Sequence, residues 1–259
     1  MLASSIDLRI WSSRRKVALL YNECMCGRFT YLTLEELTEV VAAIGERATV
    51  RLRPGSERSQ ARPGSAVQAI VSRPRVAIPS REGLSLDTAI DDASALDKPE
   101  LEIAPLTWGF TLGEGKRLVF NTRIESALGG SPLWKHAIQN GRCIMPVASF
   151  FEPHGSETVC SPRTGRPMKR QYEFADTHEQ PLLLAGVHDQ GRLSIVTTAP
   201  NASVAPVHER MPLALRFEEV PTWLEGDFAA LADRSGFQLS VRPEQIDSPE
   251  IEAAQLTLF

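Results

Sequence analysis

Residues 143–151 read CIMPVASFF, an apolar run whose composition is typical of a β-strand. Five other short segments carry similar strand signals: 66–72 (AVQAIVS), 117–121 (RLVFN), 168–174 (MKRQYEF), 182–187 (LLLAGV) and 193–198 (LSIVTT). These segments follow one another too closely for regular βαβ units. Their spacing therefore favours an antiparallel or mixed sheet that closes towards a barrel over a doubly wound parallel sheet.

Three segments around these strands carry helix signals. Residues 33–45 begin with Thr33 and Glu36 at the spacing of a capping box. The predicted apolar face of this helix consists of Leu37, Val40, Val41 and Ile44. Residues 131–141 start with Ser and Pro and end in Gly, and residues 222–232 repeat the capping-box spacing. With helices packed outside a sheet, the fold class that we predict is α+β.

The composition is that of an ordinary globular protein, with 42% hydrophobic and 23% charged residues among 259. No apolar run is long enough to span a bilayer, so we expect no membrane partner and a cytoplasmic location. The net charge of −4 argues against a protein that coats duplex DNA by bulk electrostatics, although it permits a local basic groove.

The sequence predicts neither a metal ion nor a cofactor. The four cysteines are Cys24, Cys26, Cys143 and Cys160, and they lack the C-x-x-C spacing of a zinc site or a redox dithiol. A Gly-rich phosphate loop is also missing. We therefore expect reduced cytosolic thiols, one of which can have a special role.

Residues 1–24 contain a basic stretch followed by VALLY, but the apolar part is too short for an export signal and no small-residue cleavage site follows it. Residues 81–100 and 161–167 (SPRTGRP) have weak periodicity and many turn-forming residues. We interpret both as surface loops or insertions.

Residue types that could carry chemistry gather in four short segments. They are Cys26 with Arg28 in MCGRF, Asn121 with Arg123 in NTRIES, Glu152 in SFFEP, and His208 in VHERMP. Taken singly, each has an ordinary structural explanation, because a cysteine is often a small buried hydrophobe and a lone histidine is usually structural. No single segment identifies a function.

Taken together, these segments and three others resemble the SOS-response-associated peptidase (SRAP) family. The shared motifs are MCGRF (25–29), ARPG (61–64), WGF (108–110), NTRIES (121–126), RCIMPVASFFE (142–152), LAG (184–186) and VHERMP (207–212). Their order and spacing follow the family pattern from residue 25 to about residue 237. The resemblance implies an SRAP domain over residues 25–240 that recognises abasic sites in single-stranded DNA.

For its reaction, the resemblance implies a mature N-terminus at Cys26. A terminal cysteine offers an α-amine that titrates near ~8, below the ~10.4 of lysine, so more of it is neutral and nucleophilic. The amine can form a Schiff base with the aldehyde of a ring-opened abasic sugar, and the thiol can then close a thiazolidine. The product is a stable DNA–protein crosslink, with AP-lyase and autopeptidase activities associated with it.

The resemblance places three further catalytic residues at Asn121, Glu152 and His208. Asn121 would hold the sugar or the cysteine in position, although a turn cap after a strand is the alternative. Glu152 would be a general acid and base, with a pKa raised by the flanking phenylalanines. His208 would be a second proton carrier for crosslink reversal or strand cleavage.

DNA contacts are expected at four positions. Arg28 and Arg123 would hold phosphates that flank the lesion, because guanidinium groups match phosphate oxygens. Arg142 is a further candidate, with a solvated surface arginine as its alternative. Trp108 would offer a face for base stacking, with a core position as its alternative.

The chain departs from the family pattern in two places. Pro153 stands where an aromatic residue usually follows the glutamate, and 24 residues precede Met25. Because those residues would turn the α-amine of Cys26 into an amide, we expect 1–24 to be a leader or a misassigned start. Translation from Met25 is our first explanation, and self-cleavage by Cys26 with Glu152 and His208 is the second.

Residues 241–259 form a predicted tail that is polar and ends in QLTLF. The final residues Gln255, Leu256, Leu258 and Phe259 resemble the peptide with which bacterial repair proteins bind the sliding clamp. Docking of the tail on its own domain is the alternative.

Two other functions compete with the covalent capture of abasic sites. One is a thiol peptidase that uses Cys26, Glu152 and His208, acting on other chains or only on its own. The other is a noncatalytic module that binds single strands reversibly and recruits partners through its tail. In each case we expect a monomer.

Overall fold

The computed structural model describes residues 26–46, 50–55, 57–72, 101–112 and 117–246. Its main sheet has 12 strands, and β5 and β6 form a separate two-stranded sheet. The strands are β1 (Phe29–Tyr31), β2 (Gln60–Ala61), β3 (Ala66–Ser72), β4 (Leu101–Trp108), β5 (Phe110–Leu112), β6 (Arg117–Val119), β7 (Asn121–Arg123), β8 (Arg142–Cys160), β9 (Pro167–Asp176), β10 (Leu182–Asp189), β11 (Arg192–Thr198), β12 (Met211–Pro212), β13 (Ala214–Leu215) and β14 (Leu239–Pro243).

Five strands of the main sheet pair in a ring. β8 pairs with β3, β3 with β4, β4 with β11, β11 with β10, and β10 again with β8. The β4–β11 pair is parallel and the other four are antiparallel. The predicted α+β fold, with a mixed sheet that closes towards a barrel, is therefore confirmed.

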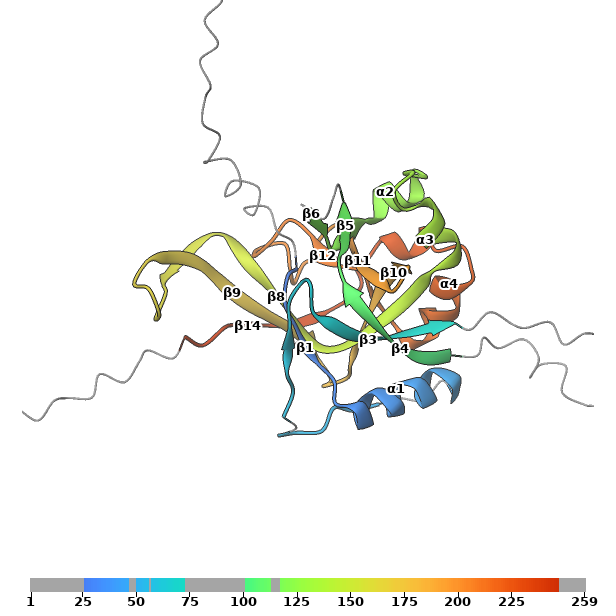
Figure 1. The fold of residues 1–259 in the computed structure, drawn as a ribbon. Coiled ribbons are helices and arrows are strands. Elements are labelled where there is room, and N and C mark those ends of the chain that lie inside the picture. Colours follow the sequence, from blue (N-terminus) through green and yellow to red (C-terminus); the bar gives the residue numbers. More distant parts are fainter. Residues whose placement is uncertain (1–25, 47–49, 56, 73–100, 113–116, 247–259) are drawn as a thin grey trace, which may run out of the picture.

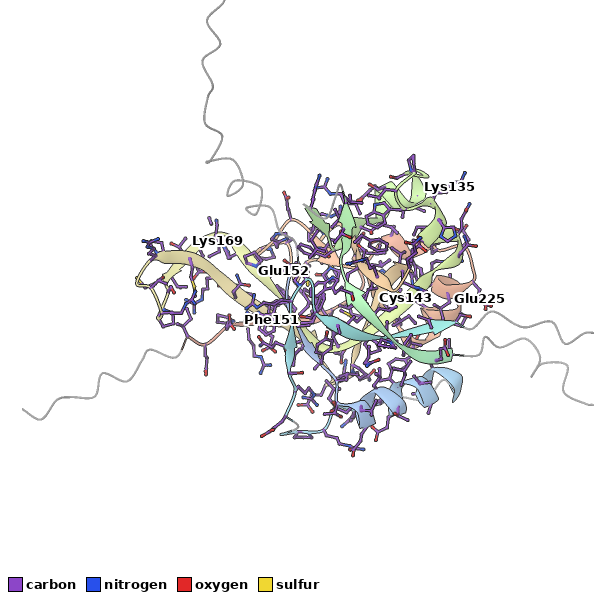
Figure 2. All side chains as sticks on the ribbon, in the orientation of Figure 1. Lys135, Cys143, Phe151, Glu152, Lys169 and Glu225 are labelled. Carbon is purple, nitrogen blue, oxygen red and sulfur yellow. The ribbon has the colours of Figure 1, made fainter. Side chains whose placement is uncertain are left out.

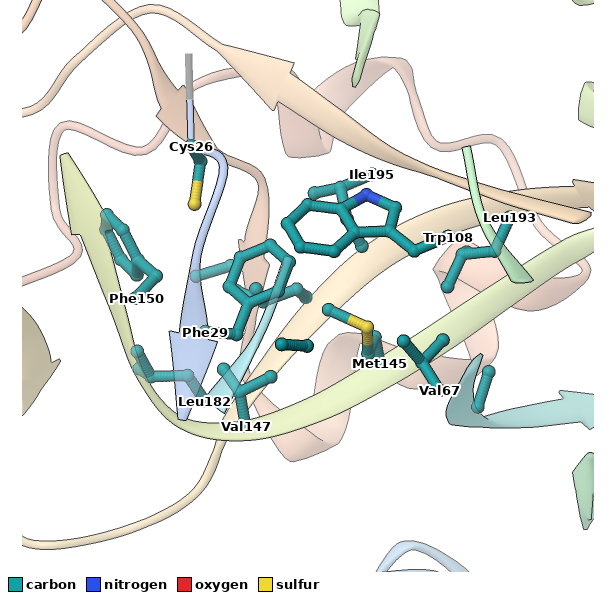
Figure 3. Close-up of a cluster of buried hydrophobic side chains, with 14 of the residues drawn as sticks. Cys26, Phe29, Val67, Trp108, Met145, Val147, Phe150, Leu182, Leu193 and Ile195 are labelled. Atoms are coloured by element: carbon teal, nitrogen blue, oxygen red, sulfur yellow. The ribbon is translucent and has the colours of Figure 1, made fainter. Parts of the chain in front are cut away.

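The ring separates two hydrophobic cores, because side chains alternate between the two faces of a strand. On β8, Cys143 and Met145 face the inner core, whereas Ile144 between them faces the outer core. The inner core fills the ring and contains Phe29, Trp108 and Cys26 at its edge (Figure 3). The outer core lies between the sheet and the helices.

The helices cover the outer core (Figure 1). They are α1 (Leu34–Glu46), α2 (Ile124–Leu128), α3 (Lys135–Asn140), α4 (Val220–Leu224) and the short 3-10 helices η2 (Phe217–Glu219) and η3 (Ala229–Ala232). The capping box of α1 is confirmed, because the Glu36 N–H donates to Thr33 Oγ1 (3.2 Å) and the Thr33 N–H donates to Glu36 Oε2 (3.0 Å). Leu37 and Val40 are buried, as their spacing predicts.

One helix prediction is right in place but too long, and another is wrong. In the segment 131–141 the α-helix begins only at Lys135, because the N–H groups of Trp134 and Lys135 both bond to the Ser131 carbonyl and form a turn first. The segment 222–232 is not one helix, because α4 ends at Leu224 and η3 starts at Ala229. At Gly226 the N–H closes the helix end onto the Thr222 carbonyl at 3.0 Å.

The strand predictions are confirmed in place, although most differ in length. The segment 66–72 has the predicted bounds, whereas 143–151 is the middle of a longer strand, β8. The segment 117–121 divides into β6 and β7, because β7 pairs with β11 in the main sheet. Strands β1, β2, β4, β5, β12, β13 and β14 were not predicted. The predicted loops at 81–100, the leader and the QLTLF ending lie outside the described residues.

β8 and β9 extend beyond the rest of the fold as a long hairpin, with the predicted loop at its turn (Figure 1). Their pairing runs from Ser149↔Ala175 to Cys160↔Pro167. β14 adds to the outer edge of β9. Among the described residues, no helix is both long and apolar enough to cross a membrane.

Candidate functional site

The four predicted catalytic residues come together at one rim of the ring. Cys26 precedes β1, which pairs with β8 through Phe29↔Phe150 and so lies next to Glu152. Asn121 is the first residue of β7, and His208 lies in the loop between β11 and β12. Strand pairing therefore brings together residues that are far apart in the sequence. Cys26 and Glu152, for example, are 126 positions apart.

Cys26 and Glu152 form the centre of the site. The backbone N–H of Cys26 donates to Glu152 Oε1 at 2.8 Å, and both residues have 0% exposure. The Cys26 thiol lies 4.0 Å from the Arg28 carbonyl oxygen and faces Phe150 at the edge of the inner core (Figure 3). The nitrogen that becomes an α-amine in a chain starting at Cys26 therefore already contacts a carboxyl group.

Burial dominates the electrostatics of this pair. Desolvation raises the pKa of Glu152 well above its usual value, and the hydrogen bond from Cys26 only partly opposes it. Desolvation also raises the pKa of the Cys26 thiol, and the charge of Glu152 raises it further. Low dielectric surroundings thus favour a protonated carboxyl and a neutral thiol in this structure.

The second oxygen of Glu152 faces His208. Oε2 accepts no hydrogen bond from the described residues, and His208 Nδ1 lies 3.9 Å from it. The same Nδ1 lies 3.2 Å from the Arg210 N–H and 3.0 Å from the Arg210 carbonyl oxygen. Nδ1 can accept from the first when neutral and donate to the second when protonated, so either protonation state of His208 has a partner.

The loop that carries His208 is held by hydrogen bonds to its backbone groups. The Asn201 side chain accepts hydrogen bonds from the N–H groups of Ser203 and Val204, both at 3.0 Å, as in an Asx turn. The His208 N–H then donates to the Val204 carbonyl at 2.9 Å. The Gly155 N–H on β8 donates to the Val207 carbonyl at 2.8 Å, which ties this loop to the strand that carries Glu152.

Asn121 holds the Cys26 segment from the other side. Its Nδ2 donates to the Cys26 carbonyl oxygen at 3.4 Å. β7 is fixed by parallel pairing with β11, where Asn121 lies opposite Ile195. This geometry fits the predicted positioning role better than a turn cap.

A pair that the sequence did not single out links two of the motifs. Arg210 in VHERMP binds Glu125 in NTRIES with two hydrogen bonds of 2.7 and 2.8 Å, and it also donates to the Thr197 carbonyl at 2.8 Å. This pair couples the His208 loop to the start of α2, directly after Asn121. Opposite charges in the two motifs were the available signal.

The predicted DNA contacts differ in their surroundings. Arg123 is exposed at the end of β7, close to Asn121. Arg28 is only 8% exposed and stacks over Phe151, with 3.8 Å from its guanidinium carbon to the ring centroid. Both of its Nη atoms bind the Glu244 carboxylate, at 2.6 and 2.7 Å. Glu244 was not predicted, and it occupies the guanidinium face that would bind a phosphate.

Two other predicted contacts are corrected. Trp108 has 0% exposure, packs on Phe29 with ring centroids 4.3 Å apart, and donates its indole N–H to the Phe120 carbonyl. It is a core residue with no free face for a base. Arg142 is the first residue of β8, ten residues before Glu152, and it donates to the Gly226 carbonyl at 2.8 Å, so it holds the segment that follows α4.

The described residues contain no cluster of three or more His, Cys, Asp or Glu side chains that could hold a metal ion. Within them, Cys26, Cys143 and Cys160 are free, and Cys160 is exposed. At Cys26, a thiol, a carboxyl group and an imidazole lie close together and offer nucleophilic and acid–base chemistry.

Two curated proteins of Bacillus subtilis (strain 168) are similar to part of this chain. One is the abasic site processing protein YoqW, 26% identical over 148 residues, which cover 54% of this chain and 60% of that protein. The other is the abasic site processing protein YoaM, 28% identical over 108 residues, which cover 41% of this chain and 47% of that protein.

Solved structures share the fold. A phage-related protein from Bordetella bronchiseptica is similar with a TM-score of 0.55 at 20% identity, covering 85% of this chain and 94% of that one. A protein from Bacteroides thetaiotaomicron reaches a TM-score of 0.54 at 17% identity, covering 85% and 92%. The family model for SOS response associated peptidase (SRAP) matches residues 25–253. The chain therefore belongs to the SRAP family.

Proposed function

We propose that this protein recognises abasic sites in single-stranded DNA and captures them covalently through Cys26. Family membership and the names of the two Bacillus relatives, abasic site processing proteins, support a role on such lesions. The observation that carries the proposal is the 2.8 Å contact between the Cys26 nitrogen and Glu152 Oε1 in a buried site. In a chain that begins at Cys26, that nitrogen is a primary amine beside a proton donor.

The first step is formation of a Schiff base. The neutral α-amine attacks C1′ of the ring-opened sugar, and the resulting carbinolamine loses its hydroxyl as water. Glu152 supplies the proton for this departure, because its raised pKa keeps a proton on the carboxyl at a pH where an exposed glutamate would be ionised. Because the proton stays on Glu152, the amine of Cys26 remains neutral and nucleophilic.

The second step closes the thiazolidine. The thiol sulfur of Cys26 adds to the imine carbon, and the thiol proton moves to the imine nitrogen. The net reaction consumes one aldehyde and releases one water. Because the thiol and the amine belong to the same residue, the ring closure needs no further approach of reactants.

The other residues of the site take positioning and proton-transfer roles in this proposal. Asn121 holds the Cys26 carbonyl and so fixes the direction of the amine. His208, 3.9 Å from Glu152, exchanges a proton with it and can remove a sugar proton from the Schiff base, which would cleave the strand as an AP lyase does. Arg123 and Arg28 bind phosphates, the latter after release of Glu244.

A thiol peptidase is supported less well by the same geometry. Such an enzyme needs a thiolate that a base activates. The pKa of the Cys26 thiol is raised by burial and by Glu152, so the thiolate is disfavoured. Amine attack needs no thiolate.

The experiment is a denaturing gel of a single-stranded oligonucleotide with one abasic site, mixed with protein that starts at Cys26. We expect a heat-stable shifted band that disappears in Cys26→Ala. Cys160→Ser, which removes an exposed thiol distant from Glu152, is the matched control and should retain the band. Reversible binding alone would support a noncatalytic module, and crosslinking by N-terminally blocked protein would contradict the amine mechanism.

The cellular setting is also part of the proposal. The family name indicates a role in the SOS response, and we place the protein on damaged DNA in the cytoplasm as a monomer. Residues 255–259 would recruit it to the sliding clamp. Deletion of 255–259 should abolish clamp binding and leave crosslinking intact, and unchanged clamp binding would dismiss this part.

A further inference from the structure

The hairpin of β8 and β9 continues well past the site as a two-stranded arm, which we define as residues 153–171 (Figure 1). Its strands still pair at Thr158↔Lys169 and Cys160↔Pro167, and a turn joins them. The arm begins directly after the Glu152↔Tyr172 pair. A long projecting element is thus rooted at the proposed general acid.

The arm carries a concentration of positive charge in an acidic protein. It has four basic residues, Arg163, Arg166, Lys169 and Arg170, and one acidic residue, Glu157, although the whole chain has a net charge of −4. The arm therefore differs in sign from the rest of the molecule. Such a local basic element is typical of a surface that binds phosphates.

The basic side chains near the tip of the arm are available for a partner. Arg163 and Arg166 are exposed, and neither forms an ion pair with any residue in the described part of the chain. Closer to the root, Arg170 pairs with Glu157 at 3.5 Å and Lys169 bonds to the Gly155 carbonyl. The tip thus presents charge that no residue in the described part of the chain neutralises. Figure 2 labels Lys169 on this projecting hairpin.

The arm also lacks the features of a protein-binding surface. Its apolar side chains Val159 and Met168 are half-buried against each other's strand, and no large exposed hydrophobic side chain lies between 153 and 171. Protein interfaces usually need apolar or aromatic anchors at their centre. Phosphate contacts need only charge and reach.

The length of the arm fits DNA that enters the site. From Tyr172 to Pro167 the strand advances five residues, which span ~17 Å at ~3.3 Å per residue. Phosphates along one strand of a duplex are spaced at about 3.4 Å along the axis, so this reach corresponds to about five nucleotides. The tip can meet the backbone several nucleotides from a sugar that reacts at Cys26.

We propose that this arm is a second DNA-binding element, which grips the phosphate backbone that flanks the abasic site through Arg163 and Arg166. This inference rests on the proposed function for the identity of the ligand. The contacts are independent of base sequence and add affinity without taking part in the reaction.

The experiment measures binding of the full chain to an oligonucleotide with a tetrahydrofuran residue, an abasic analogue that has no aldehyde to react, over a series of salt concentrations. The variant is Arg163→Gln with Arg166→Gln. The matched control is Arg51→Gln with Lys135→Gln, which removes two exposed positive charges next to α1 and on α3. Each lost phosphate contact lowers the slope of log K against log salt by ~0.9 for a duplex and ~0.7 for a single strand.

We expect weaker binding at low salt and a slope reduced by about 1.4 to 1.8 in the arm variant, with an unchanged slope in the control. A value near the lower limit indicates a single-stranded flank, and one near the upper limit a duplex flank. An unchanged slope in the arm variant would overturn the inference. Crosslinking of a natural abasic site at saturating DNA should equal that of the wild type. If the wild type does not crosslink at all but the slopes differ as expected, the DNA-binding role of the arm is supported and the proposed reaction is contradicted.

Discussion

Two glutamates of this protein are equally buried, but their pKa values are shifted in opposite directions. Glu36 and Glu152 both have 0% exposure. Burial works against the charge of Glu36, but hydrogen bonds from Arg58, Thr33 and Arg53 outweigh it and lower its pKa to about 2. Glu152 receives one N–H from Cys26, and burial raises its pKa. A compensated carboxylate stabilises the fold, whereas an uncompensated one retains a proton that it can give away.

Glu152→Gln should have the largest effect on the reaction. Glutamine keeps the size and the contact with the Cys26 nitrogen but cannot give its proton to a leaving hydroxyl. We expect crosslinking to slow by about 100- to 1000-fold, a typical loss for a general acid. Single-turnover gel assays at saturating DNA measure this rate, with Glu157→Gln on the same strand as the control. A rate within twofold of the wild type would remove Glu152 from the mechanism.

Glu36→Gln should reverse that pattern, with a large effect on stability and none on chemistry. It leaves Arg58, whose Nε lies 3.1 Å from Glu36 Oε2, without its buried counterion. We expect the free energy of unfolding to fall by about 3 kcal/mol, as is usual for a broken buried ion pair. Urea denaturation gives this value, and crosslinking per folded molecule should stay at the wild-type rate. Slower chemistry in the folded variant would show that the two glutamates are not separate in function.

The two carboxyl groups should also link stability to pH in opposite directions. The folded pKa of Glu36 is about 2, below its unfolded value near ~4.3, so its contribution is present above the unfolded value and lost as the pH falls towards 2. The raised pKa of Glu152 means that its contribution is present below the unfolded value and lost as the pH rises through the folded one.

Melting temperatures measured over a range of pH test these opposite pH dependences. The loss of Tm in Glu36→Gln should shrink between pH 6 and pH 3, whereas Glu152→Gln, which resembles the neutral acid, should gain Tm over the wild type as the pH rises. Parallel curves for the two variants would contradict the assignment of opposite charge states.

Glu244→Gln should have the smallest effect. It tests whether a third carboxylate stabilises the fold, as Glu36 does, or takes part in DNA binding at the site. Glu244 holds Arg28 with two hydrogen bonds but is 29% exposed. If Arg28 must release it to bind a phosphate, the variant should bind single-stranded DNA a few-fold more tightly, because a partly exposed ion pair is worth about 1 kcal/mol or less. Weaker binding would mean that Glu244 only keeps Arg28 in place for DNA.

Local patterns in the sequence were sufficient for much of the fold. The capping box at Thr33 and Glu36 is formed by residues three apart, and the apolar segments 143–151 and 182–187 pair with each other in β8 and β10. The broken helix at 222–232 shows the limit, because its helix signals continue beyond Gly226, where the backbone turns. The bounds of β8 depend on pairing with β9, which is a tertiary property.

For the site, the motifs named the residues but not their surroundings. The sequence could not reveal that Arg28 binds Glu244, because 216 positions separate them. It also could not decide whether Trp108 faces a base or the core, since an aromatic residue suits both. The approach of Glu152 to the Cys26 nitrogen follows from the register of β1 on β8, which no local pattern contains.

The most direct test of the central claim is the mass of the crosslinked N-terminal peptide, from protein that starts at Cys26 and reacts with an abasic oligonucleotide without added reductant. The account predicts an adduct on Cys26 with the mass of peptide plus sugar fragment minus one water, and a Cys26 thiol that no longer reacts with iodoacetamide. An adduct on another residue, or one that leaves the thiol free and survives only after borohydride reduction, would contradict it.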